Sequence, residues 1–167
     1  MQIEKVESPL RQPFLDAMSQ LTNSVCVVTT GGRAGRAGTT VTAMTPVSAD
    51  SETPSLLICL HADSLTARAI AVNGVFAVNV LSDGQSDLAN QFAGRHGRSG
   101  PDKFDGVTYH SGHTGSPHLD DAVAVFDCDL KLQQGWGTHL IFIAEVADIS
   151  INPDLQVLTY TNRKYLG

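Results

Sequence analysis

Short runs of β-branched and apolar residues recur through this chain and constrain its fold more than any other feature. Such runs, bounded by turn residues, are typical of β-strands. The predicted strands cover residues 24–30, 39–47, 56–60, 75–81, 122–130, 139–149 and 157–160. Three short helices are predicted over 13–21, where Phe14, Met18 and Leu21 share a face, 64–73 and 85–92. Because strands and helices do not alternate regularly, the pattern excludes a doubly wound parallel sheet and favours an antiparallel barrel, closed or partly open.

Capping and turn residues set several boundaries within this pattern. Asp63 or Ser64 is a suitable N-cap for the second helix, and Asn73-Gly74 is a suitable end. Pro46 interrupts a predicted strand and indicates an edge position or a bulge, because proline has no N–H to donate to a neighbouring strand. Residues 94–118 are rich in Gly, His and Ser and are predicted to form a long surface loop.

Length, composition and charge limit the class of protein. The 167 residues are 42% hydrophobic and 17% charged, which predicts one folded domain over 1–167. The net charge of −6 argues against nucleic acid as the main partner. No apolar stretch approaches about 18 residues, so no membrane span is expected. The first residues have no basic region followed by an apolar run, so no secretory signal is expected. Cys26, Cys59 and Cys128 lie in apolar runs, and we expect buried, reduced thiols in a cytoplasmic protein.

Several familiar motifs are absent or incomplete. The glycines of 31–38 lack the spacing of a dinucleotide-binding or P-loop motif, and a flexible hairpin loop is expected, with phosphate binding as the second interpretation. His110, His113 and His118 match no common spacing of metal ligands, so we expect a solvated loop and no metal. Serine hydrolase and metallohydrolase signatures are also missing.

The remaining polar residues suggest a site for a phosphorylated planar ligand. Thr40 and Thr42 project from one face of a predicted strand, where hydroxyl groups can bond a ligand edge. Ser64 and Thr66 lie at a helix start, where free backbone N–H groups favour an anion. The main basic stretch holds Arg95, Arg98 and Lys103. Each set alone also fits an ordinary strand, a helix cap or a solvated loop.

At these same residues the chain resembles the short-chain flavin reductases, which are the reductase components of two-component flavin-dependent monooxygenases such as 4-hydroxyphenylacetate monooxygenase. The resemblance covers nearly the whole chain, and the order and spacing of its segments carry it. The segments are FLDAM (14–18), VVTT (27–30), GTTVTA (38–43), LICL (57–60), FAVNVL (76–81), QFAG (91–94), DKF (102–104), GTH (137–139) and RKY (163–165). The chain departs from many members at Pro46-Val47-Ser48, Thr53-Pro54 and Thr138.

The resemblance implies a homodimeric FMN-binding split β-barrel of antiparallel, Greek-key type. FMN or FAD is expected near the subunit interface, with NADH or NADPH as the hydride donor and no protein nucleophile. Reduced flavin is expected to diffuse to a partner monooxygenase. By motif position, the residues implied to contact the flavin ring are Thr40, Thr42, Ala43, Cys59, Leu60 and His61, the last three mainly through backbone.

The resemblance also implies a phosphate site and a nicotinamide site. The phosphate residues are Ser64, Leu65 and Thr66, assisted by Lys103 and the Ala93-Gly94 turn. The nicotinamide residues are His139, Arg163 and Tyr165. His139 is the candidate catalytic residue and is expected, with Arg163, to position NADH rather than to transfer protons. A polar residue that merely opens a strand is the alternative interpretation of His139.

Three other functions remain open from the sequence. A split-barrel flavoprotein can hold FMN for electron transfer or storage without reacting with NADH. An oxidase of the pyridoxamine-phosphate type has a similar barrel, although the order of the segments argues against it. A β-rich interaction domain without a cofactor is the third alternative.

Overall fold

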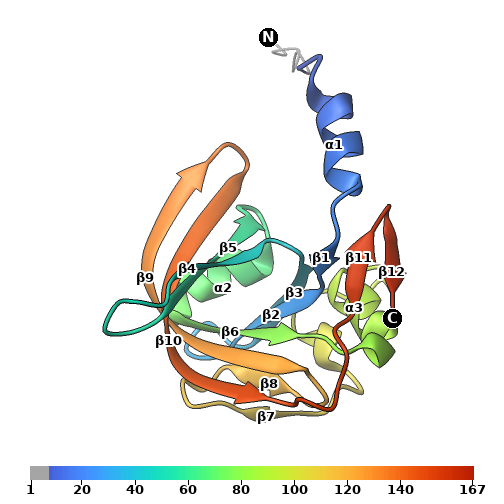
Figure 1. The fold of residues 1–167 in the computed structure, drawn as a ribbon. Helices are drawn as coiled ribbons and strands as arrows, with labels where there is room; N and C mark the ends of the chain where they lie inside the picture. The colour runs from blue at the N-terminus through green and yellow to red at the C-terminus, as the bar shows by residue number, and fades with distance from the viewer. Residues whose placement is uncertain (1–7) are drawn as a thin grey trace.

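The computed structural model describes residues 8–167 and shows a mainly antiparallel β protein with short helices around it (Figure 1). The predicted fold class is therefore confirmed. In chain order the elements are α1 (Arg11–Ser19), β1 (Asn23–Ser24), β2 (Cys26–Thr30), β3 (Ala37–Val41), β4 (Met44–Ser48), β5 (Ser55–His61), α2 (Leu65–Asn73), β6 (Val75–Val80), the 3₁₀ helix η1 (Asp83–Gln85), α3 (Ser86–Phe92), the 3₁₀ helix η2 (Gly100–Phe104), β7 (Tyr109–Ser111), β8 (Pro117–Leu119), β9 (Ala124–Trp136), β10 (His139–Ile151), β11 (Thr159–Thr161) and β12 (Lys164–Leu166).

A seven-stranded sheet with the order β3-β2-β6-β9-β10-β5-β4 forms the centre of the molecule. All of its pairings are antiparallel. The two edge strands, β3 and β4, follow one another in the chain, and only Thr42 and Ala43 separate them. The sheet must therefore curl until its edges meet, which makes a barrel that is split between β3 and β4.

The prediction of one continuous strand over 39–47 is wrong, because two strands, β3 and β4, occupy this segment. The chain turns between β3 and β4, where Met44 N donates to Thr42 O at 3.1 Å. The physical reason is a change of partner, since β3 pairs with β2 and β4 pairs with β5. The prediction for Pro46 is confirmed, because β4 is an edge strand and its register shifts between Pro46 and Ser48.

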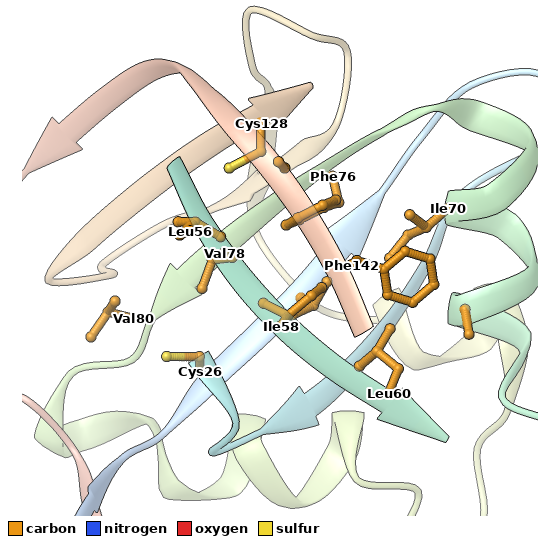
Figure 2. Packing of buried hydrophobic residues seen from close by; sticks show 13 residues of the cluster. Cys26, Leu56, Ile58, Leu60, Ile70, Phe76, Val78, Val80, Cys128 and Phe142 are labelled. Atoms are coloured by element: carbon orange, nitrogen blue, oxygen red, sulfur yellow. The ribbon is translucent and has the colours of Figure 1, made fainter. Parts of the chain in front are cut away.

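Apolar side chains fill the interior of the curled sheet (Figure 2). Phe76 and Phe142 are fully buried there, and Ile70 of α2 packs against the same cluster. Helix α2 begins as predicted at Ser64, whose side chain accepts the N–H of Ala67 at 3.0 Å, and it ends at a left-handed Gly74.

A second apolar cluster lies on the other side of β2. Val27 of β2 packs there with Phe92 of α3 and Phe104 of η2, and all three are buried. Every residue of β2 is buried, because both of its faces are covered. Helix α3, predicted over 85–92, is confirmed over Ser86–Phe92 and supplies this cover. The cluster fixes α3 and η2 beside β3, where the candidate site forms.

The predicted surface loop over 94–118 is confirmed in part, because most of the segment is exposed, but it is neither one loop nor wholly at the surface. This segment contains η2 and the hairpin of β7 and β8, and it buries the side chains of Phe104, Ser116 and His118. The many glycines indicated irregular backbone correctly. Composition did not reveal that Phe104 anchors the segment in the second cluster.

His118 belongs to a buried polar group and not to a solvated loop. Its Nε2 lies 3.1 Å from the Asp127 carboxylate on β9, in an electrostatic contact rather than a well-aligned hydrogen bond. Asp127 also accepts the backbone N–H of Thr114 at 2.9 Å and the Thr114 hydroxyl at 2.5 Å. Burial raises the pKa of Asp127, but the contacts with His118 and Thr114 outweigh it and lower the pKa overall. The group fastens the hairpin of β7 and β8 to β9.

Helix α1 stands away from the rest of the molecule (Figure 1). It spans Arg11–Ser19 rather than the predicted 13–21, and none of its residues is buried. On the shared apolar face, Phe14 is 63% exposed and Met18 is 44% exposed. An amphipathic pattern predicts that a face will be covered, without predicting which surface covers it.

The cysteines divide into two environments. Cys26 and Cys128 are buried as expected, and burial raises the pKa of Cys26 to about 12. The expectation of a buried Cys59 is wrong, because this residue is only half-buried and borders a cleft. Among residues 8–167, no helix combines the length and hydropathy that crossing a bilayer requires.

Candidate functional site

A cleft of about 320 Å³ opens at the split of the barrel. The junction of β3 and β4, the end of β5 and the start of β10 form its walls. Its lining residues are Thr39, Thr40, Val41, Thr42, Ala43, Cys59, Leu60, His61, Ser64 and His139. Every residue predicted to contact the flavin ring lies in this lining, together with His139. Residues from three separate parts of the chain therefore meet here.

The end of β5 offers backbone to this cleft. The ladder between β4 and β5 stops at Met44 and Ile58, and one further bond joins Cys59 N to Ala43 O at 3.2 Å. Strand β5 continues through Leu60 to His61, where only β10 pairs with it. One edge of this short segment thus faces the cleft without a strand partner. Unpaired strand edges hydrogen-bond planar polar groups readily.

Thr40 and Thr42 lie on the opposite wall. The Thr40 hydroxyl donates to Ala89 O of α3 at 2.7 Å, so its proton is already used and its oxygen acts as an acceptor. Alternation along β3 placed Thr40 and Thr42 on one face, and both do line the cleft. Thr39, Val41 and Ala43 line it as well, so both faces of this segment contribute to the cleft.

Two histidines face each other at the mouth of the cleft. His61 of β5 and His139 of β10 are paired across the strands, with ring centroids 5.3 Å apart in an edge-to-face arrangement. His61 Nδ1 accepts the backbone N–H of Asp63 at 3.2 Å, which assigns the proton of the neutral ring to Nε2. His139 Nδ1 lies 3.0 Å from the Thr138 hydroxyl. In both rings Nδ1 is engaged locally, which leaves Nε2 for a ligand.

A narrower compartment of about 150 Å³ adjoins the cleft. Thr39 and Ser64 line both spaces, so the two form one elongated site. The smaller compartment is also lined by Leu65 and Thr66 at the start of α2 and by Lys103. Backbone N–H groups in the first turn of a helix have no partner within the helix and carry partial positive charge. We call this compartment the anion end.

Lys103 is held in place by two backbone carbonyl groups. Its Nζ donates to Phe92 O at 2.8 Å and to Gly38 O at 3.3 Å, which leaves one of its three N–H bonds for a ligand. Burial lowers the pKa of Lys103, because it disfavours the charged ammonium. A side chain at position 38 would place its Cβ 2.7 Å from the Phe92 ring, so only glycine allows this close approach.

The structure does not bring the remaining predicted residues into this lining. Ala93 and Gly94 follow α3 and line neither compartment, although the preceding carbonyl holds Lys103. Tyr165 of β12 packs against Tyr160 with ring centroids 5.2 Å apart. The turn and the aromatic pair thus lie outside the lining of the site.

Arg163 lies in a separate groove of about 290 Å³ beside α1. The groove meets the main cleft at Thr42, which lines both. Arg163 Nη2 is 2.7 Å from Asp16 Oδ1, and this hydrogen bond lowers the pKa of Asp16. Arg163 has a left-handed backbone in the turn between β11 and β12, with φ of 62°. That hairpin was not predicted beyond residue 160.

Comparisons with known proteins agree with this geometry. A family model described as "Flavin reductase like domain" matches residues 18–167. The chain is 38% identical over 152 residues to the FMN reductase (NADH) RutF of Pseudomonas syringae pv. syringae, which covers 91% of this chain and 83% of the relative. It is 34% identical over 155 residues to the 4-hydroxyphenylacetate 3-monooxygenase reductase component of Salmonella typhimurium, with 93% and 90% covered.

A solved structure with a similar fold is the NADH:FAD oxidoreductase SgcE6 of Streptomyces globisporus in complex with NAD and FAD fragments. The TM-score is 0.85 at 28% identity, and the match covers 98% of this chain and 96% of the other. The similarity therefore includes the whole curled sheet and the elements around the cleft.

Proposed function

The chain belongs to the family of flavin reductase like domains, and we propose that it transfers hydride from NADH to FMN held in the elongated site. The observation that carries this proposal is the joining of the wide cleft to the anion end at Thr39 and Ser64. FMN has the same order of parts, with a planar ring system at one end and a phosphate at the other. FAD shares both parts and is the second flavin to test.

The residues of the anion end fit a phosphate. Lys103 offers one free N–H bond, and the first turn of α2 offers backbone N–H groups at Leu65 and Thr66. Ser64 uses its side chain to cap α2 and so fixes the direction of these groups. A cation and a helix N-terminus that converge on one small space are well suited to bind a doubly charged group.

We assign the ring system to the wider cleft. When bound, the flavin supplies the hydride acceptor and the nicotinamide supplies the hydride. Thr40, Thr42 and Ala43 bound one side of the ring, and Cys59 with the unpaired edge of Leu60–His61 bounds the other. Their task is to fix the plane of the ring, since hydride transfer requires the reacting atoms within about 3–3.5 Å.

We propose that His139 positions the nicotinamide. Its ring stands at the mouth of the cleft with Nε2 available, and His61 packs against it edge to face. Arg163, in the groove that meets the cleft at Thr42, is assigned to a more distant part of NADH. Tyr165 is assigned an indirect role through Tyr160, which lines the same groove.

The test is oxidation of reduced nicotinamide, followed by its absorbance, with added FMN, with added FAD and without flavin. Fast NADH oxidation that requires added flavin is the expected result, and NADPH in the same assay determines the donor. A protein that binds FMN but leaves NADH unchanged would contradict the proposal and support electron transfer or flavin storage. A protein that binds neither flavin would favour an interaction domain.

We propose that reduced flavin leaves the site and supplies a partner monooxygenase. The cleft opens to solvent beside exposed His61 and His139, which supports exchange of the ring. Anaerobic reduction of FMN in large molar excess over protein is the expected result. Reduction that stops at one flavin per protein would contradict release. We propose a cytoplasmic location with this role, because NADH is supplied in the cytoplasm. We also propose that residues 1–167 act as one domain.

We also propose a homodimer. Apolar side chains on α1 and on the arm of β9 and β10 are exposed, among them Phe14 and Trp136, which is 79% exposed. Helix α1 and the tip of the β9–β10 hairpin project from the body of the molecule at two separate places, where a second copy can cover their side chains (Figure 1). Light scattering of the purified protein is expected to give twice the chain mass. An active monomer at micromolar concentration would contradict the dimer.

A further inference from the structure

The glycine-rich segment 31–38 forms the loop before β3 and the first two residues of that strand, and it reaches the anion end. Its last two residues, Ala37 and Gly38, line that compartment, and Gly38 O accepts the Lys103 ammonium at 3.3 Å. Arg36 directly precedes them but does not line the compartment. Any effect of Arg36 on a bound phosphate must therefore be indirect.

The Arg36 guanidinium lies against two aromatic rings next to Lys103. Its carbon is 5.2 Å from the centroid of the Phe104 ring and 5.7 Å from that of Tyr109. Its Nη1 also donates to the Tyr109 hydroxyl. A planar guanidinium that packs on aromatic rings and donates a hydrogen bond as well is held in one orientation. Because Phe104 directly follows Lys103 in η2, Arg36 restrains the backbone from which the lysine projects.

The other contacts of Phe104 lead to the second carbonyl group that holds Lys103. The Phe104 ring is buried and lies edge to face with Phe92, with centroids 5.0 Å apart. Phe92 O accepts Lys103 Nζ at 2.8 Å, and Gln91 Nε2 donates to Lys103 O at 2.8 Å. A Cβ at Gly38 would lie 3.4 Å from the Phe104 ring. Phe104 therefore lies where β3, η2 and α3 meet, and the ammonium keeps its two acceptors only while these elements stay together.

The loop that carries Arg36 is anchored separately, at the end of α2. Asn73 accepts the N–H of Ala34 at 2.7 Å and donates to Gly35 O at 3.0 Å. Arg36 itself is exposed, so no buried group loses its cover when the side chain is shortened. Loss of the guanidinium is therefore expected to loosen η2 and to leave the loop and the fold in place.

We propose that Arg36 is a positioning residue for Lys103 and that the affinity of the enzyme for phosphorylated flavin depends on this role. The inference rests on the proposed function, because it takes the flavin phosphate to lie at the anion end. With Arg36 in place, Phe104 stays packed on Phe92, and the Lys103 ammonium keeps one N–H bond free for the phosphate. Without Arg36, η2 can shift, and phosphate binding must then also reorder the lysine, which lowers affinity.

The test measures the dissociation constants of FMN and of riboflavin, which lacks the phosphate, by quenching of flavin fluorescence. Arg36→Gln loses the ring contacts and a charged hydrogen bond, so it is expected to weaken FMN about 3- to 10-fold and riboflavin by less than about twofold. Tyr109→Phe removes only the hydroxyl, and its effect on FMN is expected to be about two- to threefold. Arg33→Gln is the matched control, because Arg33 is an exposed arginine of the same loop that makes neither ring contact, and it is expected to change neither constant.

A double variant separates action through Lys103 from independent action. Once Lys103→Gln has removed the ammonium, Arg36 has nothing left to position. Adding Arg36→Gln to Lys103→Gln is therefore expected to weaken FMN by no more than about twofold further. If the added loss is as large as the loss that Arg36→Gln causes in the wild-type protein, Arg36 acts independently of Lys103 and the proposal is wrong.

Three other outcomes locate an error. If Arg36→Gln weakens FMN and riboflavin equally, Arg36 supports the fold as a whole and not Lys103, which overturns the proposal. If Arg36→Gln changes neither constant, η2 is held without Arg36, and this inference fails while the proposed function stands. If Lys103→Gln itself leaves FMN binding unchanged, the phosphate lies elsewhere, and the assignment of the anion end fails together with this inference.

Discussion

The two ends of the elongated site are built in different ways. At the anion end, Lys103 is half-buried and two carbonyl groups fix its ammonium, while Ser64 fixes the first turn of α2. At the mouth, His61 and His139 are exposed and bond only to their immediate neighbours in the chain. The anion end is thus set by the tertiary fold, whereas the mouth is set by one pair of strands.

This difference suggests a division of labour. A preset and partly desolvated cation binds an anion strongly, because little reorganisation accompanies binding. Exposed histidines with local partners bind more weakly and suit a substrate that enters and leaves in every cycle. We therefore expect the anion end to determine flavin affinity and the mouth to determine the KM for NADH.

The largest expected effect belongs to Lys103. Lys103→Gln removes the charge, so the dissociation constant of FMN is expected to rise about 10- to 100-fold, the value of one charged hydrogen bond. Riboflavin has no phosphate, and its binding is expected to change by less than about threefold. Fluorescence titration with both ligands measures the difference.

Two further variants control this experiment. Lys131→Gln removes a lysine that pairs with Glu145 on the surface of β9 and β10, and it is expected to leave both ligands unaffected. Lys103→Arg keeps the charge and is expected to retain the preference for FMN over riboflavin. If Lys103→Gln weakens riboflavin as much as FMN, Lys103 supports the fold and not the phosphate.

The pH dependence of flavin binding sharpens the same contrast. Burial lowers the pKa of Lys103, so its ammonium is lost at a lower pH than that of an exposed lysine. As the pH rises through this lowered pKa, FMN binding is expected to weaken while riboflavin binding does not. The same ring ionises in FMN and in riboflavin, so the ratio of their two dissociation constants cancels the effect of ring ionisation. If the ratio stays constant up to the pH at which exposed lysines lose their proton, then the bound phosphate, and not burial, determines the pKa of Lys103.

The sequence predicts the local parts of this molecule well. Helix α2 was placed correctly because its cap, Ser64, and its end, Gly74, are encoded within the segment itself. The break between β3 and β4 was missed, because it arises from the meeting of two sheet edges. The buried polar pair of Asp127 and His118 was missed for the same reason, since its two members come from different strands.

The candidate site shows the same limit. Alternation placed Thr40 and Thr42 on one face, and the resemblance to flavin reductases supplied their partners on β5. From the residues alone Lys103 was part of a basic stretch, and the resemblance added its place at the phosphate. Its fixed position depends on Gly38, which is 65 residues away. Arg36 was set aside with the glycine-rich loop, because nothing local indicates that this loop faces α2.

The mouth is expected to show a moderate effect. His139→Ala removes one hydrogen-bonding group from the proposed nicotinamide position, so the KM for NADH is expected to rise about 3- to 10-fold. The dissociation constant of FMN is expected to change by less than about twofold. Steady-state kinetics at saturating FMN, together with titration of FMN, separate the two. Normal NADH turnover in this variant would contradict the positioning role and support the alternative, in which His139 is only a polar residue at the start of a strand.

The smallest expected effect lies behind the mouth, at the contact between Asp16 and Arg163. Both side chains are exposed, so Asp16→Asn is expected to leave the fold intact and to free the Arg163 guanidinium. The KM for NADH is then expected to change by no more than about threefold, and the change should shrink at high salt because exposed charges are screened. Arg11→Gln, on the same helix but outside the groove, is the control. A larger effect of Asp16→Asn than of His139→Ala would reverse the contrast, because α1 and not the strand pair would then hold NADH.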